Sequence, residues 1–211
     1  MDLTTMRALV RRDLHDEDAA NYRWTNDELD RHVARAVKEL SLAAPLEANA
    51  TLTTAEGSRD LSLASLTGLV VVEAVEYPVG EYPPSYAPFS VWGDVLTLLV
   101  DATPLSAQDV CVYYGKLHTL DAGTSTIPGR LEDVVATGAA AYAALEWASF
   151  ATNRVNVGGP DVWRQYLVWG QERLAAFARE LARHGRRAGV RMRRLYRPAG
   201  PADLRATRWE A

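Results

Sequence analysis

Cysteine is almost absent from this chain, since Cys111 is the only one in 211 residues. A single cysteine excludes an internal disulfide, fits a reducing compartment and cannot form a paired-cysteine zinc site. The glycine patterns that cradle phosphates, and the GxSxG and HExxH motifs of hydrolases, are also missing. The four histidines fall on separate predicted elements, with no two at metal-ligand spacing. We therefore expect no cofactor, no metal and no catalytic residues.

Long apolar runs are missing as well. No stretch looks long enough to cross a bilayer, and the first residues, MDLTTMRALVRRDL, lack the three-part pattern of a signal peptide. Hydrophobic residues make up 48% of the chain and charged residues 24%, as in an ordinary globular domain with a core of its own. We expect a single domain, or one domain with an inserted second layer, and no membrane partner.

Charge is unevenly distributed, although the formal net charge is only −4. Residues 151–211 contain 13 arginines and five acids, a net charge of +8, whereas the preceding residues carry −12. Opposite charges on the two parts indicate a chain that binds copies of itself, or a charged partner, in a fixed orientation. The alternative is a C-terminal tail that is merely solvated.

Four helices are expected. Residues 24–44 have the clearest start, because Thr25 and Glu28 stand at the spacing of a capping box. Residues 2–14 form a shorter helix before it. The intervening residues 15–18 hold three acids but no glycine, so we expect a solvated loop and not a cation site. Two long helices follow over 128–152 and 160–186, the first capped from within residues 124–126.

The pattern between the second and third helices alternates as in strands. Gly93 and Asp94 have the order of a type II′ hairpin turn, and the proline-rich residues 78–88 form an exposed loop. We predict a mainly α fold with a β insertion (α+β), in which a bundle of about four helices carries a small antiparallel sheet between helices two and three. The predicted parts are a helical bundle (1–48 and 119–187), an inserted β subdomain (49–118) and a flexible Arg-rich C-terminal tail (188–211).

Two residues stand out as candidates for chemistry. Glu146 lies among alanines of the third helix, where it would pair with an arginine of the fourth helix or be buried with a raised pKa. Cys111 lies between valines of a strand, which favours a structural thiol over a nucleophile.

The Arg-rich tail raises the question of nucleic-acid binding. Its arginines could neutralise phosphates. However, the sequence pI is about 5.6 and no nucleic-acid-binding motif is present, so an acidic protein surface is at least as good a partner. Leu195, Tyr196, Leu204 and Trp209 are spaced among the basic residues, which predicts that the tail gains structure on binding.

Several stretches together resemble the head-to-tail adaptor (connector) proteins of tailed bacteriophages. They are WTNDEL at 24–29 with its helix to residue 42, GSRDLSL at 57–63, VEAVEY at 72–77, VYYGK at 112–116, and TIP at 126–128 continuing through LEDVV at 131–135. The order of helices, β insertion and two long helices fits as well. The resemblance covers roughly residues 1–185, and its motifs are packing motifs.

The resemblance implies a structural virion protein without enzymatic activity, made in the host cytoplasm and placed at the head-tail interface. Such adaptors form a homo-oligomeric ring of about twelve copies with heterologous interfaces. The ring binds the portal protein on one side and the downstream tail or stopper protein on the other, and DNA passes through the lumen without sequence recognition. By this analogy the tail is the portal anchor, with Arg191, Arg193, Arg194, Leu195, Tyr196, Arg197 and Trp209 as the binding residues.

Two alternatives stay open. A nucleic-acid-binding packaging accessory protein would lose binding steeply with salt, and would lose it entirely without the residues after Gly185. A small enzyme of unrecognised type would have a pocket in which Glu146 or Cys111 has a strongly shifted pKa.

Overall fold

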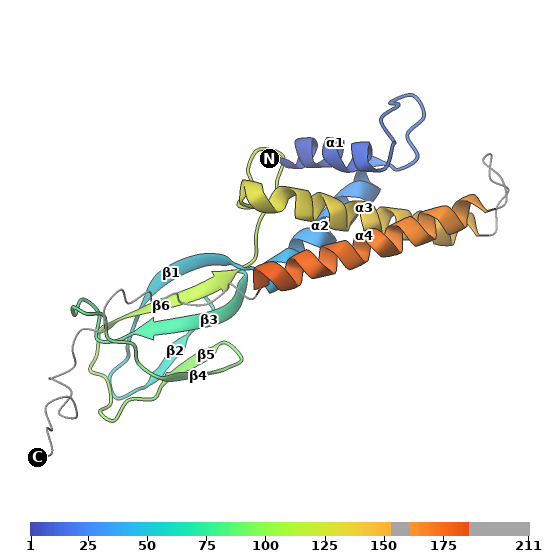
Figure 1. The fold of residues 1–211 in the computed structure, drawn as a ribbon. Coiled ribbons are helices and arrows are strands. Elements are labelled where there is room, and N and C mark those ends of the chain that lie inside the picture. Colours follow the sequence, from blue (N-terminus) through green and yellow to red (C-terminus); the bar gives the residue numbers. More distant parts are fainter. Residues whose placement is uncertain (153–160, 186–211) are drawn as a thin grey trace, which may run out of the picture.

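The computed structural model describes residues 1–152 and 161–185. Its helices form one bundle, and its strands form a β subdomain at one end of that bundle (Figure 1). The helices are α1 (Leu3–Asp13), α2 (Asn26–Ala43), α3 (Gly129–Ala151) and α4 (Val162–Gly185). The strands are β1 (Leu46–Thr53), β2 (Asp60–Ser62), β3 (Leu69–Glu76), β4 (Phe89–Trp92), β5 (Val95–Leu98) and β6 (Asp109–Lys116). The predicted α+β class is confirmed, while the exact division of the chain into domains stays a prediction.

Helix α2 begins with the predicted capping box. The Thr25 hydroxyl accepts a hydrogen bond from the Glu28 backbone N–H at 3.3 Å, and the Glu28 carboxylate accepts one from the Thr25 N–H at 2.7 Å. These two bonds satisfy donors that the first turn of a helix leaves without partners. The apolar side of α2, with Leu29, Val33 and Leu40, is fully buried in the bundle core.

Helix α3 is the centre of the bundle and packs against all three other helices. Its small residues let α4 approach closely, as the alanine-rich sequence predicts. A Cβ added at Gly138 would lie 2.9 Å from the ring of Phe177, and one at Gly170 would lie 2.9 Å from the Leu145 side chain. Both glycines therefore allow the two helices to pack more closely than a larger residue would.

Helix α3 also corrects the expectation that no segment could cross a bilayer. By length and composition, with a mean hydropathy of 1.2, it is the one helix within residues 1–152 and 161–185 that is long and apolar enough to do so. However, 61% of its apolar window is buried inside the protein. Its central place in the bundle core accounts for that composition.

The start of α3 differs from the prediction. Its N-cap is Pro128, with no side-chain hydrogen bond to the helix. The hydroxyls expected to cap it are used in the preceding loop instead. The Ser125 Oγ accepts from the Ile127 N–H at 3.1 Å, and the Thr126 Oγ1 accepts from the Thr119 N–H at 2.8 Å.

The strands form two three-stranded antiparallel sheets, with orders β1-β6-β3 and β2-β5-β4, where the sequence suggested one small sheet. Strand β1 pairs with β6 along its whole length, from Leu46 opposite Lys116 to Thr53 opposite Asp109. Strands β4 and β5 form the predicted hairpin, and Gly93 has φ +57° at the first turn position, as a type II′ turn requires. The subdomain has an apolar core of its own, which includes Leu61, Leu63, Val75, Leu96, Leu98, Val110 and Val112.

Two chain segments join the bundle to the β subdomain, one after α2 and one after β6. The buried Ser41 hydroxyl of α2 accepts from the backbone N–H of His118 at 2.9 Å. The His118 ring lies between the carbonyl oxygens of Ala44 and Thr126, with Nε2 and Nδ1 each 3.1 Å from one of them. The side chain of His118 therefore holds the outgoing and returning segments together at the junction.

Candidate functional site

The seven tail residues expected to bind a partner (Arg191, Arg193, Arg194, Leu195, Tyr196, Arg197 and Trp209) lie outside the described residues. The geometry that can be described concerns three other features: a groove beside Glu146, the loop between α1 and α2, and two exposed aromatic side chains of the β subdomain.

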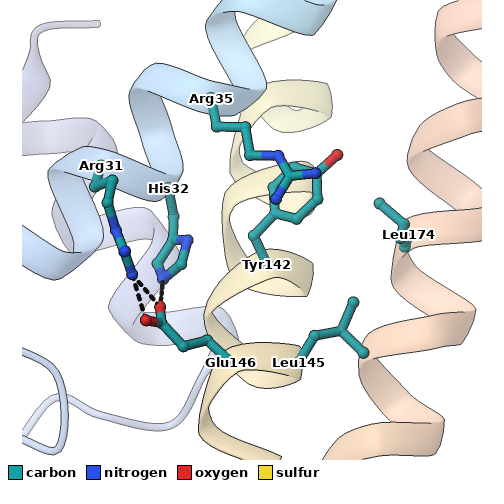
Figure 2. Close-up of a pocket in the computed structure, with 7 residues that line it drawn as sticks. All are labelled: Arg31, His32, Arg35, Tyr142, Leu145, Glu146 and Leu174. Carbon is teal, nitrogen blue, oxygen red and sulfur yellow. Dashed lines mark hydrogen bonds and ion pairs between the residues drawn. The ribbon is translucent and has the colours of Figure 1, made fainter. Parts of the chain in front are cut away.

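A groove of about 510 Å³ lies between α2, α3 and α4. Figure 2 shows Arg31, His32 and Arg35 entering it from α2 and Glu146 from α3, with Leu174 of α4 on the far side. Tyr142 and Leu145 complete the lining. The i, i+4 spacing of Arg31 and Arg35, and of Tyr142 and Glu146, brings each pair onto one face of its helix.

Glu146 is held by α2 and not by α4. Both of its carboxylate oxygens accept from the Arg31 guanidinium, and the His32 Nε2 lies 2.6 Å from one of them. The hydrogen bond from Arg31 lowers the pKa of Glu146. The prediction for this residue is therefore wrong twice, in the helix that provides the arginine and in the direction of the pKa. The physical reason is that Glu146 is half-exposed and faces α2 across the helix pair.

His32 is buried, and burial lowers its pKa while the neighbouring Glu146 opposes that effect. Its Nε2 is close to the Glu146 carboxylate but has no hydrogen bond of good geometry to it. A buried imidazole with a lowered pKa is mainly neutral at neutral pH. His32 therefore lines the groove as a polar but uncharged group.

The other end of the groove contains a second neutralised set. The Tyr142 hydroxyl donates to the Glu39 carboxylate at 2.7 Å, and the Arg35 guanidinium lies 3.8 Å from the centre of the Tyr142 ring. Arg35 also pairs with Glu39 at 3.3 Å. Burial and the Glu39 carboxylate raise the pKa of Tyr142 to about 12.

These contacts leave the groove with little capacity for acid-base catalysis. Each arginine already faces a carboxylate, and the carboxylate of Glu146 is stabilised in its charged form, which makes it a weak base. Cys111 lies far along the chain on β6, half-buried opposite Thr51 of β1 and Glu76 of β3. Within the described ranges, no three His, Cys, Asp or Glu side chains come together as metal ligands do.

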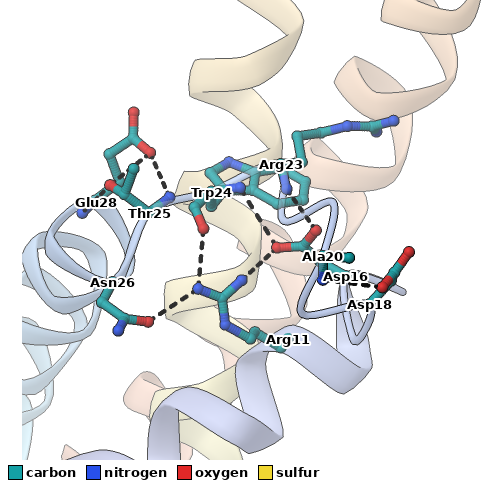
Figure 3. A network of polar contacts seen from close by, with 9 residues as sticks. All are labelled: Arg11, Asp16, Asp18, Ala20, Arg23, Trp24, Thr25, Asn26 and Glu28. Atoms are coloured by element: carbon teal, nitrogen blue, oxygen red, sulfur yellow. Dashed lines mark hydrogen bonds and ion pairs between the residues drawn. The ribbon is translucent and has the colours of Figure 1, made fainter.

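The loop between α1 and α2 contains a buried ion pair, shown in Figure 3. The Arg11 guanidinium donates to the Asp16 carboxylate at 2.5 Å and to the backbone oxygen of Trp24 at 2.9 Å. Asp16 in turn accepts from the backbone N–H of Arg23 at 2.7 Å. Both charged side chains are 6% exposed. The expectation of a solvated loop is therefore wrong for Asp16. This buried side chain stabilises the loop, because it accepts hydrogen bonds from residues at both ends of the loop.

An aromatic cluster joins this loop to the two long helices. The Trp147 and Tyr166 rings lie 4.4 Å apart, and Trp24 lies 6.3 Å from Tyr166. The guanidinium of Arg23 lies 4.5 Å from the centre of the Trp147 ring and donates to the Tyr166 hydroxyl. The signal for this cluster in the sequence is Trp24, which directly precedes the capping box.

The β subdomain exposes large aromatic side chains. Tyr82, in the proline-rich loop, is 97% exposed, and Trp92, beside the hairpin turn, is 91% exposed. Isolated exposed apolar residues are common, but a tryptophan this open at the tip of a hairpin is typical of a contact element.

Comparison with known proteins gives one family match. A sequence model described as SU10 adaptor protein matches residues 1–199, which include every described helix and strand. No curated protein matches the chain.

Proposed function

The chain belongs to the SU10 adaptor protein family, and from this premise we propose that it is the head-to-tail adaptor of a tailed phage, joining the portal to the next tail component. The observation that carries the proposal is the extent of the match, which covers the helical bundle, the β subdomain and part of the Arg-rich tail. The neutralised charges of the groove support a structural role, since they leave no poised acid or base there.

The proposed assembly is a ring of about twelve copies with heterologous contacts between neighbours. The portal protein binds one side of the ring and a downstream tail or stopper protein binds the other. DNA passes through the lumen without sequence recognition, and the acid excess before residue 151 suits such passage because carboxylates repel phosphates. The protein is made in the host cytoplasm and ends in the virion.

The proposed portal anchor is the Arg-rich tail. Its binding residues are Arg191, Arg193, Arg194, Leu195, Tyr196, Arg197 and Trp209. Arginines attract an acidic partner over a distance, and the interspersed apolar residues add contact area once the segment has docked. Binding of this kind weakens with salt and with the loss of either residue type.

The test mixes the purified full-length protein with its portal and measures ring formation by cryo-electron microscopy and affinity by sedimentation. Arg191→Gln, Arg193→Gln, Arg194→Gln and Arg197→Gln combined should weaken portal binding by about tenfold or more, as loss of several charge pairs does. The matched control is Arg130→Gln with Arg179→Gln, which removes exposed arginines of α3 and α4. Unchanged affinity in the fourfold variant would remove the tail from the portal interface.

The same titration separates the adaptor from a packaging accessory that binds nucleic acid. An adaptor forms its ring with the portal in the absence of DNA. Binding to duplex DNA in place of the portal would favour the accessory protein instead, with the logarithm of the binding constant falling steeply and linearly with the logarithm of salt concentration.

A further inference from the structure

The β subdomain carries an acid charge that nothing described in the protein compensates. Residues 49–118 contain eight acids against Arg59 and Lys116, a formal net charge of −6. Ion pairs within the described ranges all lie in the helical bundle and its loops, and no carboxylate of residues 49–118 takes part in one. A region with this net charge attracts a basic partner through its exposed carboxylates.

The opposite charge is present in the same chain. Residues 186–211 contain eight arginines and two acids, a formal net charge of +6. Leu195, Tyr196, Leu204 and Trp209 lie among those arginines. The segment thus has both kinds of residue that a surface of carboxylates and exposed aromatic rings would bind.

The segment begins beside the β subdomain. Helix α4 ends at Gly185, where a Cβ would lie only 2.9 Å from the carbonyl oxygen of Ala43, the last residue of α2. Pro45 follows two residues later and packs so closely on Gly115 of β6 that a Cβ there would lie 2.6 Å from the proline ring. Gly185, the last described residue of the chain, therefore lies beside the point where α2 passes into β1.

The exposed hairpin tip lies at this same end of the β subdomain. The N–H of Leu63 donates to the carbonyl oxygen of Asp94 at 2.8 Å, which holds the tip beside the short connection from β2 to β3. Strand β3 starts with Leu69 opposite Lys116, at the end of β6 that returns to the bundle. The β4-β5 turn accordingly points toward the end of α4 in Figure 1, and it carries Trp92 and the exposed Asp94.

We propose that residues 186–211 fold back in the free protein and bind the β subdomain of the same chain, with arginines on its carboxylates and apolar side chains on Trp92. The short path from Gly185 favours binding within one chain, because a short tether gives an effective concentration of about 1 mM. This inference does not depend on the adaptor function. It adds that a portal requiring the same arginines must first displace the segment from the β subdomain.

The first test is hydroxyl-radical footprinting of the full-length protein, read by mass spectrometry at Trp92. The comparison variant combines Arg191→Gln, Arg193→Gln, Arg194→Gln and Arg197→Gln, and the control is Arg130→Gln with Arg179→Gln. With an intrinsic Kd of about 0.1 mM the segment is bound about nine-tenths of the time, so Trp92 should oxidise roughly tenfold faster in the fourfold variant than in the other two proteins. Salt at about 1 M should raise the rate in the unmodified protein to that of the fourfold variant, since it screens the arginines.

The second test identifies where the segment binds. Arg193→Lys keeps the charge and adds an amine, which a zero-length carbodiimide joins to a carboxylate in contact with it. We expect crosslinks to residues within 49–118, formed inside one chain in a mixture of isotope-labelled and unlabelled copies. Equal oxidation of Trp92 in all proteins, crosslinks only to the helices, or crosslinks mainly between differently labelled copies would each overturn the proposal. Unchanged far-ultraviolet circular dichroism shows that the variants are folded.

Discussion

The helical bundle and the β subdomain handle charge in opposite ways. In the bundle, Arg7, Arg11 and Arg31 each bond to a carboxylate of another element or loop, and these pairs connect α1, α2 and α3. In the β subdomain the described carboxylates form no ion pairs, and two apolar sheet faces provide the stability. The difference teaches that ion pairs between elements contribute to the structure of the bundle, whereas the described β subdomain is stabilised by apolar packing.

The bundle and the β subdomain each have an apolar core of their own, and removing a core side chain should give the largest loss of stability. Phe177 of α4 is 1% exposed against Tyr142 in the bundle, and Leu96 of β5 is fully buried in the β subdomain. Phe177→Ala should lower the free energy of unfolding by about 3–5 kcal/mol and Leu96→Ala by about 2–5 kcal/mol, because each leaves a cavity. Calorimetry checks both. Two resolved transitions, each shifted by only one variant, would show that the regions unfold independently, whereas one shared transition would show that the junction couples them.

The buried ion pair tests whether charge in the bundle is structural. Arg11→Met leaves Asp16 buried without its partner, so we expect a loss of about 3–5 kcal/mol in urea unfolding. The adjacent Arg12 provides a matched control, since its pair with Glu17 is exposed, with side chains 72% and 60% accessible. Arg12→Met should cost less than about 1 kcal/mol. Equal losses for the two variants would contradict a special role for the Asp16 network.

The close packing of α3 against α4 can be tested by adding one methyl group where the two helices meet. Gly138→Ala places a Cβ 2.9 Å from the Phe177 ring, which is buried and cannot move freely, so stability should fall by about 1–3 kcal/mol. Gly129→Ala has no neighbouring atom within 4 Å and serves as the control. Thermal denaturation of both variants is sufficient. A neutral Gly138→Ala variant would mean that the helix pair separates at little cost.

Lowering the pH is expected to have the smallest effect on the free energy of unfolding, and that effect should come from titratable groups in the bundle. His32 has a lowered pKa in the folded protein, so the unfolded chain binds a proton that the folded one resists, and stability falls as the pH drops below about 6.5. The lowered pKa of Glu146 acts in the same direction at more acid pH, because its stabilising contribution is lost as it becomes protonated. His32→Gln should flatten the stability curve between about pH 7 and 5, as measured by urea unfolding at each pH. A His32→Gln curve parallel to that of the unmodified protein would refute this assignment.

Local signals in the sequence predicted the helices well. The capping box at Thr25 and Glu28, the hairpin turn at Gly93 and the close approach along α3 each depend on residues near one another in the chain. The pairing of β1 with β6 could not be predicted from such local signals. Leu46 and Lys116 are brought together only when the whole insertion folds, and an alternating pattern names the faces of a strand but not its neighbour.

The polar sites were harder to predict for the same reason. The run of acids after α1 has the composition of a solvated loop, yet Asp16 is buried in an ion pair with Arg11 of that helix. Glu146 could face either α2 or α4, and its pairing with Arg31 of α2 depends on how the helices pack in three dimensions, which local sequence signals do not specify.

The junction at His118 has a mechanical consequence. One imidazole bridges the segments that leave and re-enter the bundle, and Ser41 holds the backbone of the same residue. Two domains joined by two separate linkers can rotate relative to one another at the linkers, whereas a hydrogen-bonded bridge between the linkers restricts that rotation. A force applied to the β subdomain should therefore reach the helices of the bundle through this bridged junction, with little loss to bending at the two connecting segments.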